Sequence, residues 1–420
     1  MKRIDDKDKV LFKNTIMLYI LQFSSYLFSF ITVPYQTRVL GPVVYGVLGV
    51  AAATMAYFQL FMDFGFMLSA TEDISLNRED KAFVSKKLTS IALIKVCFAT
   101  ISVLVIVALT LFIEPFSKYK TLYIVYVLAF VMQSFLPDYF FRGIEKMSAV
   151  TIRTVAVKFF CCVMTFVFLR TEEDYLVVPI LLLIGNIGAV VWAYAYIYKT
   201  LGYKFQKVTV SEIIYDLKRS AIFFLSRIAS TVYSATNTVI MGFIDKTGIS
   251  TGYFTSADKI ISTAKGAIAP ISDSFYPYMV KHKNFKMVAR VLLVVEPVIL
   301  LGCIVVGIFA EPICIIAFGK EFAGAAPVLK AFLPVVIVLL PSYILGFPTL
   351  SAMNLSKYAN YSIFFGTAVH LIGIVILVAT SNISAITLAT LSAISETAIM
   401  LFRLITVIKH RNVFKQKSID

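Results

Sequence analysis

The stretch TGYFTSADKIISTAKGAIAPISDSFY, residues 251–276, decides the fold, because it determines how many times the chain crosses a membrane. It is largely apolar but carries two aspartates and two lysines, which a hydropathy window penalises. On either side of it, apolar runs follow one another along the chain, and each is long enough for a transmembrane helix of about 20 residues. If this stretch also crosses, every later segment changes side.

The composition favours a protein that lies in a lipid bilayer. Of the 420 residues 59% are hydrophobic and 15% are charged, and the mean hydropathy is +0.85. The apolar runs predict an all-α integral membrane protein with twelve transmembrane helices. They lie at residues 12–33, 43–68, 88–113, 121–141, 148–169, 175–198, 220–244, 251–279, 288–310, 326–350, 360–380 and 383–408.

The distribution of basic residues tests whether the stretch 251–276 crosses. With both termini in the cytoplasm, the inside segments carry twenty-six lysines and arginines and the outside loops carry six. Without this crossing the later segments exchange sides, and the counts become eighteen and sixteen. Because cytoplasmic loops of membrane proteins are enriched in lysine and arginine, we expect the stretch to cross. The formal net charge of +15 then reflects orientation in the membrane rather than binding of nucleic acid.

Several classes of function are disfavoured by what the sequence lacks. The five cysteines all lie inside predicted spans, without a CxxC motif or clustered histidines, so neither a metal site nor a disulfide framework is expected. The outside loops are too short to hold an extracytoplasmic catalytic site, and no ATP-binding motif is present. We therefore expect no enzyme, no catalytic residue and no cofactor other than a coupling proton or sodium ion.

Two six-helix lobes around a central cleft are the predicted architecture. The charged connection near residues 199–219 separates an N-terminal lobe, residues 1–205, from a C-terminal lobe, residues 206–420. The lobes are weakly alike, since TVPYQTRVLGPVVYGVLGVAA in the first has a counterpart in NTVIMGFIDKTGISTGYFTSADK in the second. Repeats of this kind are typical of transporters that move around a site near the middle of the membrane.

Charged residues within the spans indicate where such a site lies. A charge at the centre of a membrane helix costs about 2.5–3.5 kcal/mol and usually faces a cavity. Asp258 and Lys265 share one face of the eighth span, and Arg227 shares a face of the seventh with Ser230 and Ser234. We expect these faces to line a hydrated cavity in which Arg227 and Lys265 bind an anion. Helix packing is the alternative explanation for the hydroxyls.

Asp258 and Lys265 are also expected to influence each other's charge. They lie about two helical turns apart, roughly 10.5 Å along the axis, which is too far for a direct ion pair. In a poorly screened cleft this distance still allows one charge to bias the other. The alternative is that Asp258 pairs with Lys259 or with an adjacent helix end, which leaves Lys265 as an independent contact.

Five further charged residues lie near the cytoplasmic ends of spans. Arg153 and Lys158 of the fifth span face either the mouth of the cavity or the lipid headgroups. Asp63, and Asp138 with Arg142, are predicted to form local ion pairs that close an inner gate. Plain solvation at the membrane interface is the alternative for these three residues.

Two acidic residues inside later spans are candidates for binding a coupling ion. Glu296 precedes Pro297 in the ninth span, and Glu396 lies beside Ser395 in the twelfth. An acid in lipid is readily kept protonated, so either residue could bind a proton or a sodium ion. A hydrogen-bonded structural carboxyl is the alternative. His370, a single histidine in the eleventh span, is interpreted as a packed polar group.

Five short motifs resemble the polysaccharide flippases of the multidrug/oligosaccharidyl-lipid/polysaccharide (MOP) superfamily, which include the O-antigen transporters. They are TRVLGPVVYGVLG after the first span, DFGF and LPDYFFRGIEKM at the ends of the second and fourth, GYFTSADKI at the start of the eighth and FGKEFAGAAPVLK before the tenth. The resemblance covers nearly the whole chain. The fourth-span motif departs from the family, since Tyr139 and Arg142 stand where many relatives carry Trp and Gln.

The resemblance implies a transporter that flips an oligosaccharide linked to a polyprenyl diphosphate from the cytoplasmic to the outer face by alternating access, for cell-surface polysaccharide biosynthesis. It also implies a bacterial or archaeal cytoplasmic membrane, with membrane lipids and the polysaccharide polymerase machinery as partners. By resemblance, the TRVLGP turn is an outer hinge in which Gly41 and Pro42 set the bend. Arg38, which precedes this turn, either takes part in gating or anchors the helix end at the outer interface.

Two other functions stay open at this stage. A multidrug or other small-molecule antiporter of the same superfamily is expected to have a more apolar, acidic pocket and less basic charge. A membrane-embedded glycosyltransferase or polymerase is expected to have a large external loop that carries acids or arginines, and such a loop is not found in this sequence.

Overall fold

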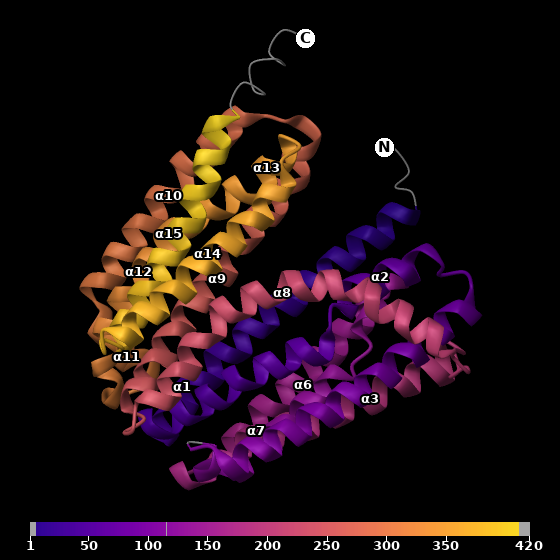
Figure 1. Ribbon diagram of the computed structural model, residues 1–420, viewed down its shortest axis with the longest axis horizontal. Helices are drawn as coiled ribbons and strands as arrows, with labels where there is room; N and C mark the ends of the chain where they lie inside the picture. The colour runs from indigo at the N-terminus through magenta and orange to yellow at the C-terminus, as the bar shows by residue number, and fades with distance from the viewer. Residues whose placement is uncertain (1–5, 115, 411–420) are drawn as a thin grey trace. The chain divides into compact units, whose positions relative to one another are not determined.

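The computed structural model describes residues 6–114 and 116–410, and for residues 6–12, 226, 230, 233 and 234 it describes the backbone alone. The predicted cavity positions of Ser230 and Ser234 therefore lie outside the described side chains. All regular elements in the described part of the chain are helices (Figure 1), so the predicted all-α class is confirmed.

The chain forms two compact units that its first and eighth helices share. The first unit takes the residues up to Leu40 together with Ala51–Thr231, and the second takes Gly41–Val50 and the residues from Val232 onward. Such a grouping of contacts does not test the predicted lobes, residues 1–205 and 206–420, which stay a prediction.

The helices have the following bounds. The shared helices are α1 (Asp6–Asp63) and α8 (Val210–Ile244). The first unit adds α2 (Phe66–Leu76), α3 (Lys81–Phe112), α4 (Lys120–Ser134), α5 (Asp138–Gly143), α6 (Met147–Phe168) and α7 (Val177–Ala195). The second adds α9 (Ile249–His282), α10 (Phe285–Ile308), α11 (Ala310–Phe318), α12 (Ala326–Ile344), α13 (Leu350–Ala352), α14 (Ser356–Ala379) and α15 (Ala385–Lys409). Short helical turns are η1 (Ser117–Tyr119), η2 (Glu172–Leu176), η3 (Tyr196–Thr200), η4 (Lys320–Ala325) and η5 (Leu345–Thr349).

Among the described residues, nine helical segments are long and apolar enough to cross a membrane. The first of them, Lys13–Leu76, is 64 residues long and contains the predicted spans one and two. Spans seven and eight correspond to α8 and α9, which have 35 and 34 residues. These two helices are not among the nine apolar segments because they carry more polar residues. The protein is therefore a multi-pass membrane protein. The number of twelve crossings is consistent with these helices.

The break in α1 lies where the sequence has Gly41 and Pro42. Gly41 has φ 64° and ψ 174°, a conformation that is open to glycine and strained for other residues. After this break, α1 packs on the start of α9 inside the second unit. A Cβ atom on Gly252 would lie 2.0 Å from the carbonyl oxygen of Pro42, so only glycine fits there. The two stretches that looked alike in sequence thus contact each other.

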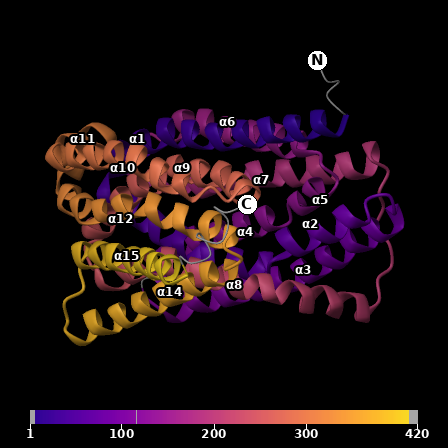
Figure 2. The same ribbon diagram turned by 90° about the horizontal axis from the view of Figure 1, so that it is seen from above.

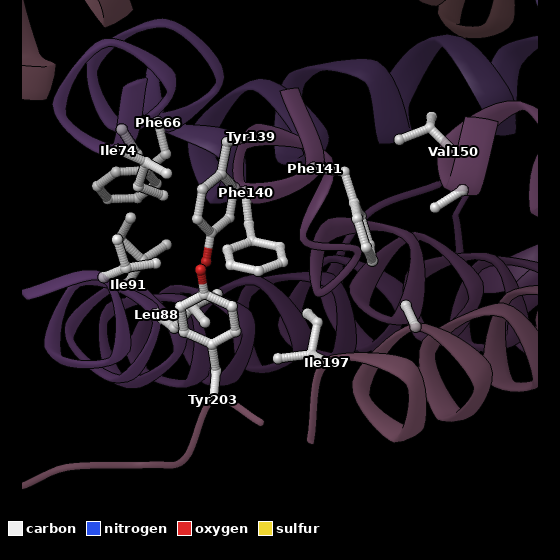
Figure 3. Packing of buried hydrophobic residues seen from close by; sticks show 14 of the residues in the cluster. Phe66, Ile74, Leu88, Ile91, Tyr139, Phe140, Phe141, Val150, Ile197 and Tyr203 are labelled. Atoms are coloured by element: carbon white, nitrogen blue, oxygen red, sulfur yellow. The ribbon is translucent and has the colours of Figure 1, made fainter. Parts of the chain in front are cut away.

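The first unit has an aromatic core that includes the predicted LPDYFFRGIEKM motif. Tyr139, Phe140 and Phe141 of α5 are all buried and pack against α2, α3 and the segment that follows α7. The rings of Phe140 and Tyr203 meet edge to face, with centroids 5.1 Å apart. Figure 3 shows the hydroxyl groups of Tyr139 and Tyr203 pointing toward each other. This motif therefore fastens the end of α4 and the short helix α5 into the core.

In the second unit, α12, α14 and α15 run side by side, as both Figure 1 and Figure 2 show. The helix that begins as α12 is interrupted by η5, where Gly346 leaves the helical conformation with ψ −125°. Pro348 lacks an N–H group. The carbonyl oxygen four residues earlier, which that group would bind in a regular helix, therefore needs another donor. The Thr349 hydroxyl supplies it by donating to the Ile344 carbonyl at 2.7 Å. The broken helix therefore keeps its backbone satisfied inside the unit.

Candidate functional site

Lys265 and Glu396 form an ion pair within the second unit. The Lys265 Nζ atom lies 3.0 Å from Glu396 Oε1, and the two residues belong to α9 and α15. The carboxyl side chain is 9% exposed and the lysine side chain 30%. A buried carboxylate is costly without such a partner. The structure therefore joins the predicted anion-binding cation to the predicted coupling-ion residue, and the ion pair of Lys265 is with Glu396 rather than Asp258.

A network of neutral polar side chains joins the same helix, α15, to α8 and α14. The fully buried His370 of α14 has its Nδ1 atom 3.0 Å from the Ser395 hydroxyl and its Nε2 atom 3.1 Å from Asn237 Oδ1. The Asn237 amide donates to Ser392 at 2.9 Å. The polar faces of the seventh and twelfth spans therefore meet around His370, in agreement with its interpretation as a packed polar group.

Arg403 is a buried cation in the twelfth span that sequence analysis missed. Its Nη1 atom donates to the carbonyl oxygen of Ser342 at 2.7 Å, and its Nε atom donates to the hydroxyl of Ser362 at 2.8 Å. Ser342 lies just before the interruption at η5, where the regular backbone bonding of α12 ends. Arg403 therefore supports the broken helix, and its side chain lies against Gly346.

The two acidic residues predicted for an inner gate both form ion pairs in the first unit, but with unexpected partners. Asp138 accepts from Nη1 and Nη2 of Arg153 at 2.8 and 3.2 Å, so the predicted pairing with Arg142 is wrong. Asp63 lies 3.6 Å from Lys95. Arg142 is exposed, whereas Arg153 and Lys95 are buried in membrane helices, where an ion pair is less screened. The gating role of these residues stays a prediction.

Arg153 and Lys158, predicted at the cavity mouth, both contact other groups within the first unit. Arg153 is 5% exposed, and its two terminal nitrogens hold Asp138, so the guanidinium is committed to this ion pair. Its Nε atom is buried without a hydrogen-bond partner among the described atoms. Lys158 donates to the hydroxyl of Ser25, on α1, at 2.6 Å. Neither of these two contacts identifies an anion-binding site.

Four other predicted residues lie on α1, α8, α9 and α10. Arg227 is exposed on α8, and Arg38 is exposed on α1 shortly before the break at Gly41. Asp258 is half-buried on α9. Glu296 is half-buried on α10, and its Oε2 atom is buried without a hydrogen-bond partner among the described residues. Their predicted roles in binding, gating and ion coupling are not tested by these positions.

A cluster of buried charges joins α2, α3 and α8 in the first unit. The Nζ atom of Lys87 contacts carboxylate oxygens of both Asp73, at 2.9 Å, and Asp216. Asp216 also accepts from the Ser90 hydroxyl at 2.6 Å, and Arg219 lies 2.7 Å from Asp73. Sequence analysis placed Asp216 and Arg219 in the charged connection near residues 199–219 and assigned the cluster no role. The i, i+3 spacing of Asp216 and Arg219 on one helical face was a signal that could have identified part of the cluster.

The cysteines and other metal-ligand types are scattered in the described part of the chain. Cys97, Cys161, Cys162, Cys303 and Cys314 are free thiols. No group of three or more His, Cys, Asp or Glu side chains among the described residues could hold a metal ion.

Comparison with protein families and curated proteins gives consistent matches. The family described as "Polysaccharide biosynthesis protein" matches residues 11–283. A protein of Escherichia coli K12 named "Putative O-antigen transporter" is 27% identical over 357 residues, which cover 82% of this chain and 84% of that protein. A protein of the same name from Shigella dysenteriae is 25% identical and covers 86% of this chain and 91% of the relative.

Solved structures share the fold at lower identity. An inward-facing multidrug resistance transporter of the MATE family, in the MOP superfamily, has a TM-score of 0.75 at 12% identity and covers 96% of this chain and 99% of its own. The lipid II flippase MurJ in an inward closed conformation has a TM-score of 0.72 at 16% identity and covers 95% of this chain and 89% of its own. These likenesses show the helical membrane-transporter fold that the sequence predicts.

Proposed function

Since the chain belongs to the polysaccharide biosynthesis protein family, we propose that it is a flippase that moves a polyprenyl-diphosphate-linked oligosaccharide from the cytoplasmic to the outer face of the membrane. The observation that carries this proposal is the similarity to the curated O-antigen transporter over more than four fifths of both chains. The fold likeness to a lipid II flippase supports the same class of substrate. On this proposal the protein is a transporter and catalyses no chemical reaction.

The physical need for such a protein follows from the substrate. Each sugar hydroxyl taken into hydrocarbon without a partner costs about 2–7 kcal/mol, so an oligosaccharide headgroup meets a barrier of tens of kcal/mol. A polar path through a helical membrane protein supplies such partners along the way. The polyprenyl tail stays in lipid throughout. The two compact units of the chain suit alternating access, in which such units move relative to each other.

Lys265 and Arg227 are the proposed contacts for the diphosphate. Lys265 contacts a carboxylate oxygen of Glu396 in this structure, and a diphosphate oxygen is proposed to take the place of that carboxylate. Arg227 is exposed on α8, and the planar guanidinium group of arginine matches the geometry of phosphate oxygens. Replacing either by alanine is expected to reduce transport, with folded protein retained. Normal transport by both variants would remove the anion-binding part of the proposal.

The energy source is proposed to be an ion gradient, with Glu296 and Glu396 as the candidate sites for a proton or a sodium ion. Glu296 supports this role because one of its carboxyl oxygens is buried without a partner among the described residues. In proteoliposomes, Glu296→Gln should lower transport driven by an imposed pH or sodium gradient more than it lowers equilibrating transport. An equal effect on both would assign Glu296 a structural role.

The proposed location is the cytoplasmic membrane of a bacterium, with both termini in the cytoplasm and the polysaccharide polymerase machinery as a partner. The basic residues of the inside segments and the bacterial relatives support this orientation and host. A cysteine in place of Asn284, between α9 and α10, should react with an impermeant thiol reagent in inverted vesicles and stay unreactive in intact cells. Reaction in intact cells would overturn the topology.

The test of the function is the membrane face on which the substrate accumulates. Deletion of the gene should leave lipid-linked oligosaccharide on the cytoplasmic face, accessible to a lectin in inverted vesicles and protected in sealed cells. Expression of the chain from a plasmid should restore surface polysaccharide. If the oligosaccharide reaches the outer face at the normal rate without the gene, the proposed function fails. The multidrug alternative rests on the fold likeness alone, at 12% identity.

A further inference from the structure

A pocket lies within the first unit, between the start of α3 and the start of α8. Its volume is about 300 Å³. The side chains that line it include Phe83, Lys86, Lys87, Glu212, Tyr215 and Asp216. The first turns of α3 and α8 lie in two segments that the distribution of lysine and arginine predicts to be cytoplasmic. The pocket is separate from the ion pair of Lys265, which lies in the second unit.

The two walls of this pocket carry opposite charges that balance. Helix α3 supplies the ammonium groups of Lys86 and Lys87, and α8 supplies the carboxylates of Glu212 and Asp216. Lys86 lies 2.9 Å from Glu212, and Lys87 contacts Asp216. Because each cation already has a carboxylate, a free anion such as a diphosphate gains little here. A neutral group that both donates and accepts hydrogen bonds suits such walls best, and a hydroxyl is that group.

The charges are built into the structure rather than held loosely at the surface. Lys87 and Asp216 are 7% and 6% exposed, and the Ser90 hydroxyl donates to Asp216 at 2.6 Å. Glu212 accepts from the backbone N–H of Thr209 at 2.7 Å, which fixes it at the start of α8. Hydrogen bonds to ionised groups are roughly twice as strong as those between neutral groups. A polyhydroxylated ligand would therefore meet preorganised charged partners.

Two aromatic rings complete the pocket. The Nζ atom of Lys87 lies 5.4 Å from the ring centre of Phe83 and 5.5 Å from that of Tyr215. Tyr215 is 56% exposed, so much of its ring is available to a ligand, and its hydroxyl accepts from Arg219 at 3.2 Å. An exposed aromatic ring beside hydrogen-bonding groups offers a flat apolar surface for the C–H face of a sugar ring.

From this geometry we propose that the pocket binds a sugar of the substrate's headgroup on the cytoplasmic side, before the headgroup crosses the membrane. This inference rests on the proposed flippase function and adds a sugar-binding subsite to it. A volume of about 300 Å³ is at the lower end for ligand pockets, so the subsite takes part of the oligosaccharide rather than the whole chain.

The test is protection of a cysteine placed in the pocket. Ser211 lines the pocket and is exposed, so Ser211→Cys should react with an impermeant maleimide in inverted vesicles. Glu79→Cys, at a side chain 98% exposed outside the pocket, is the control. Vesicles that contain the host's lipid-linked oligosaccharide should slow alkylation at position 211 several-fold. Vesicles from a strain that cannot attach the first sugar to the polyprenyl carrier should show no slowing.

A pair of variants separates ring stacking from general shielding. Tyr215→Ala removes the ring and should abolish the protection, whereas Tyr215→Phe keeps the ring and should retain it. Equal protection with and without the oligosaccharide would show that ordinary lipid or the closed pocket covers the site, and would overturn the proposal. The same holds if Tyr215→Ala protects as well as Tyr215→Phe. These results leave the flippase function itself untouched, because that function is judged by the face on which oligosaccharide accumulates.

Discussion

Replacing Lys87 by methionine tests what holds the N-terminal half of α8 to the first unit, and the neighbouring Lys86 provides a matched control. Both lysines lie on α3 and both contact a carboxylate of α8. They differ in burial, because the Lys87 side chain is 7% exposed and that of Lys86 is 45% exposed. The same chemical change at adjacent positions therefore separates a buried ion pair from a solvated one.

The expected loss can be worked out from the partners of Lys87. Without the ammonium group, Asp73 keeps Arg219 at 2.7 Å, but Asp216 stays buried beside the Ser90 hydroxyl and loses its cation. Removing one partner of a buried ion pair costs about 3–5 kcal/mol. The protein could instead protonate an aspartate, which at pH 7 costs about 4 kcal/mol from an ordinary pKa near 3.9. Both routes give about 4 kcal/mol. Lys86→Met is expected to cost below about 1 kcal/mol.

The assay is thermal unfolding of the purified protein in detergent. A destabilisation of 1 kcal/mol lowers Tm by about 2–4 °C in a unit of this size, so Lys87→Met should lower it by roughly 8–16 °C. At pH 5 the protonation route costs only about 1.5 kcal/mol, so the deficit relative to the unsubstituted protein should shrink. The double variant Lys87→Met with Asp216→Asn should recover part of the loss, since it leaves no carboxylate without a partner at this position.

Two results would refute this account of Lys87. Equal losses for Lys86→Met and Lys87→Met would mean that burial does not distinguish the two pairs. A double variant that is no more stable than Lys87→Met would mean that the stranded carboxylate is not the cause of the loss. Either result would also weaken the view that α8 is fastened to the first unit through these charges.

Three further predictions follow from the geometry. Gly252→Ala should destabilise the protein by about 1–3 kcal/mol or more, because its new Cβ meets a backbone carbonyl, whereas Gly302→Ala, with open space around it, should be neutral or slightly stabilising in thermal unfolding. In a double-mutant cycle, Lys265→Met and Glu396→Gln should couple by more than 0.5 kcal/mol, and additive effects would contradict their ion pair. Hydrogen bonds from Thr209 and then from Lys86 hold the pKa of Glu212 at about 2. Its stabilising contribution should therefore be complete above the unfolded value near 4.3 and disappear as the pH falls toward 2, seen in thermal unfolding as a difference in Tm from Glu212→Gln that shrinks over this range.

Much of the fold could be predicted because its determinants are local. Apolar runs of sufficient length identify membrane helices without knowledge of their neighbours. The break in α1 was also local, since Gly41 can adopt a conformation that is strained for other residues and the adjoining Pro42 lacks an N–H group. The prediction of span eight required the distribution of basic residues along the whole chain. The charges at Asp258 and Lys265 lower the hydropathy of this 34-residue helix, so its apolar character alone does not identify it.

The ion pairs could not be predicted because their partners are distant in sequence. Helical periodicity gives the face on which a charge lies, but it does not give the helix that faces it. Arg142 is the local candidate for Asp138, four residues away, yet Arg153 provides two donors from a buried position. In a site with little water such a paired contact is stronger than one at the surface. The same reasoning explains why Lys95 and Arg403 were missed.

On the proposed function, an anionic substrate binds one of these paired cations only if the existing contact of that cation rearranges. Arg153 and Lys265 are each held by a carboxylate in this structure, and Lys158 is bonded to a hydroxyl. On the proposed function, a diphosphate that binds Lys265 must therefore displace Glu396. Displacement leaves a buried carboxylate without its cation, which is costly unless that carboxylate takes up a proton. Binding of substrate at Lys265 and binding of a proton at Glu396 are then coupled by electrostatics alone, because each removes the other's cost.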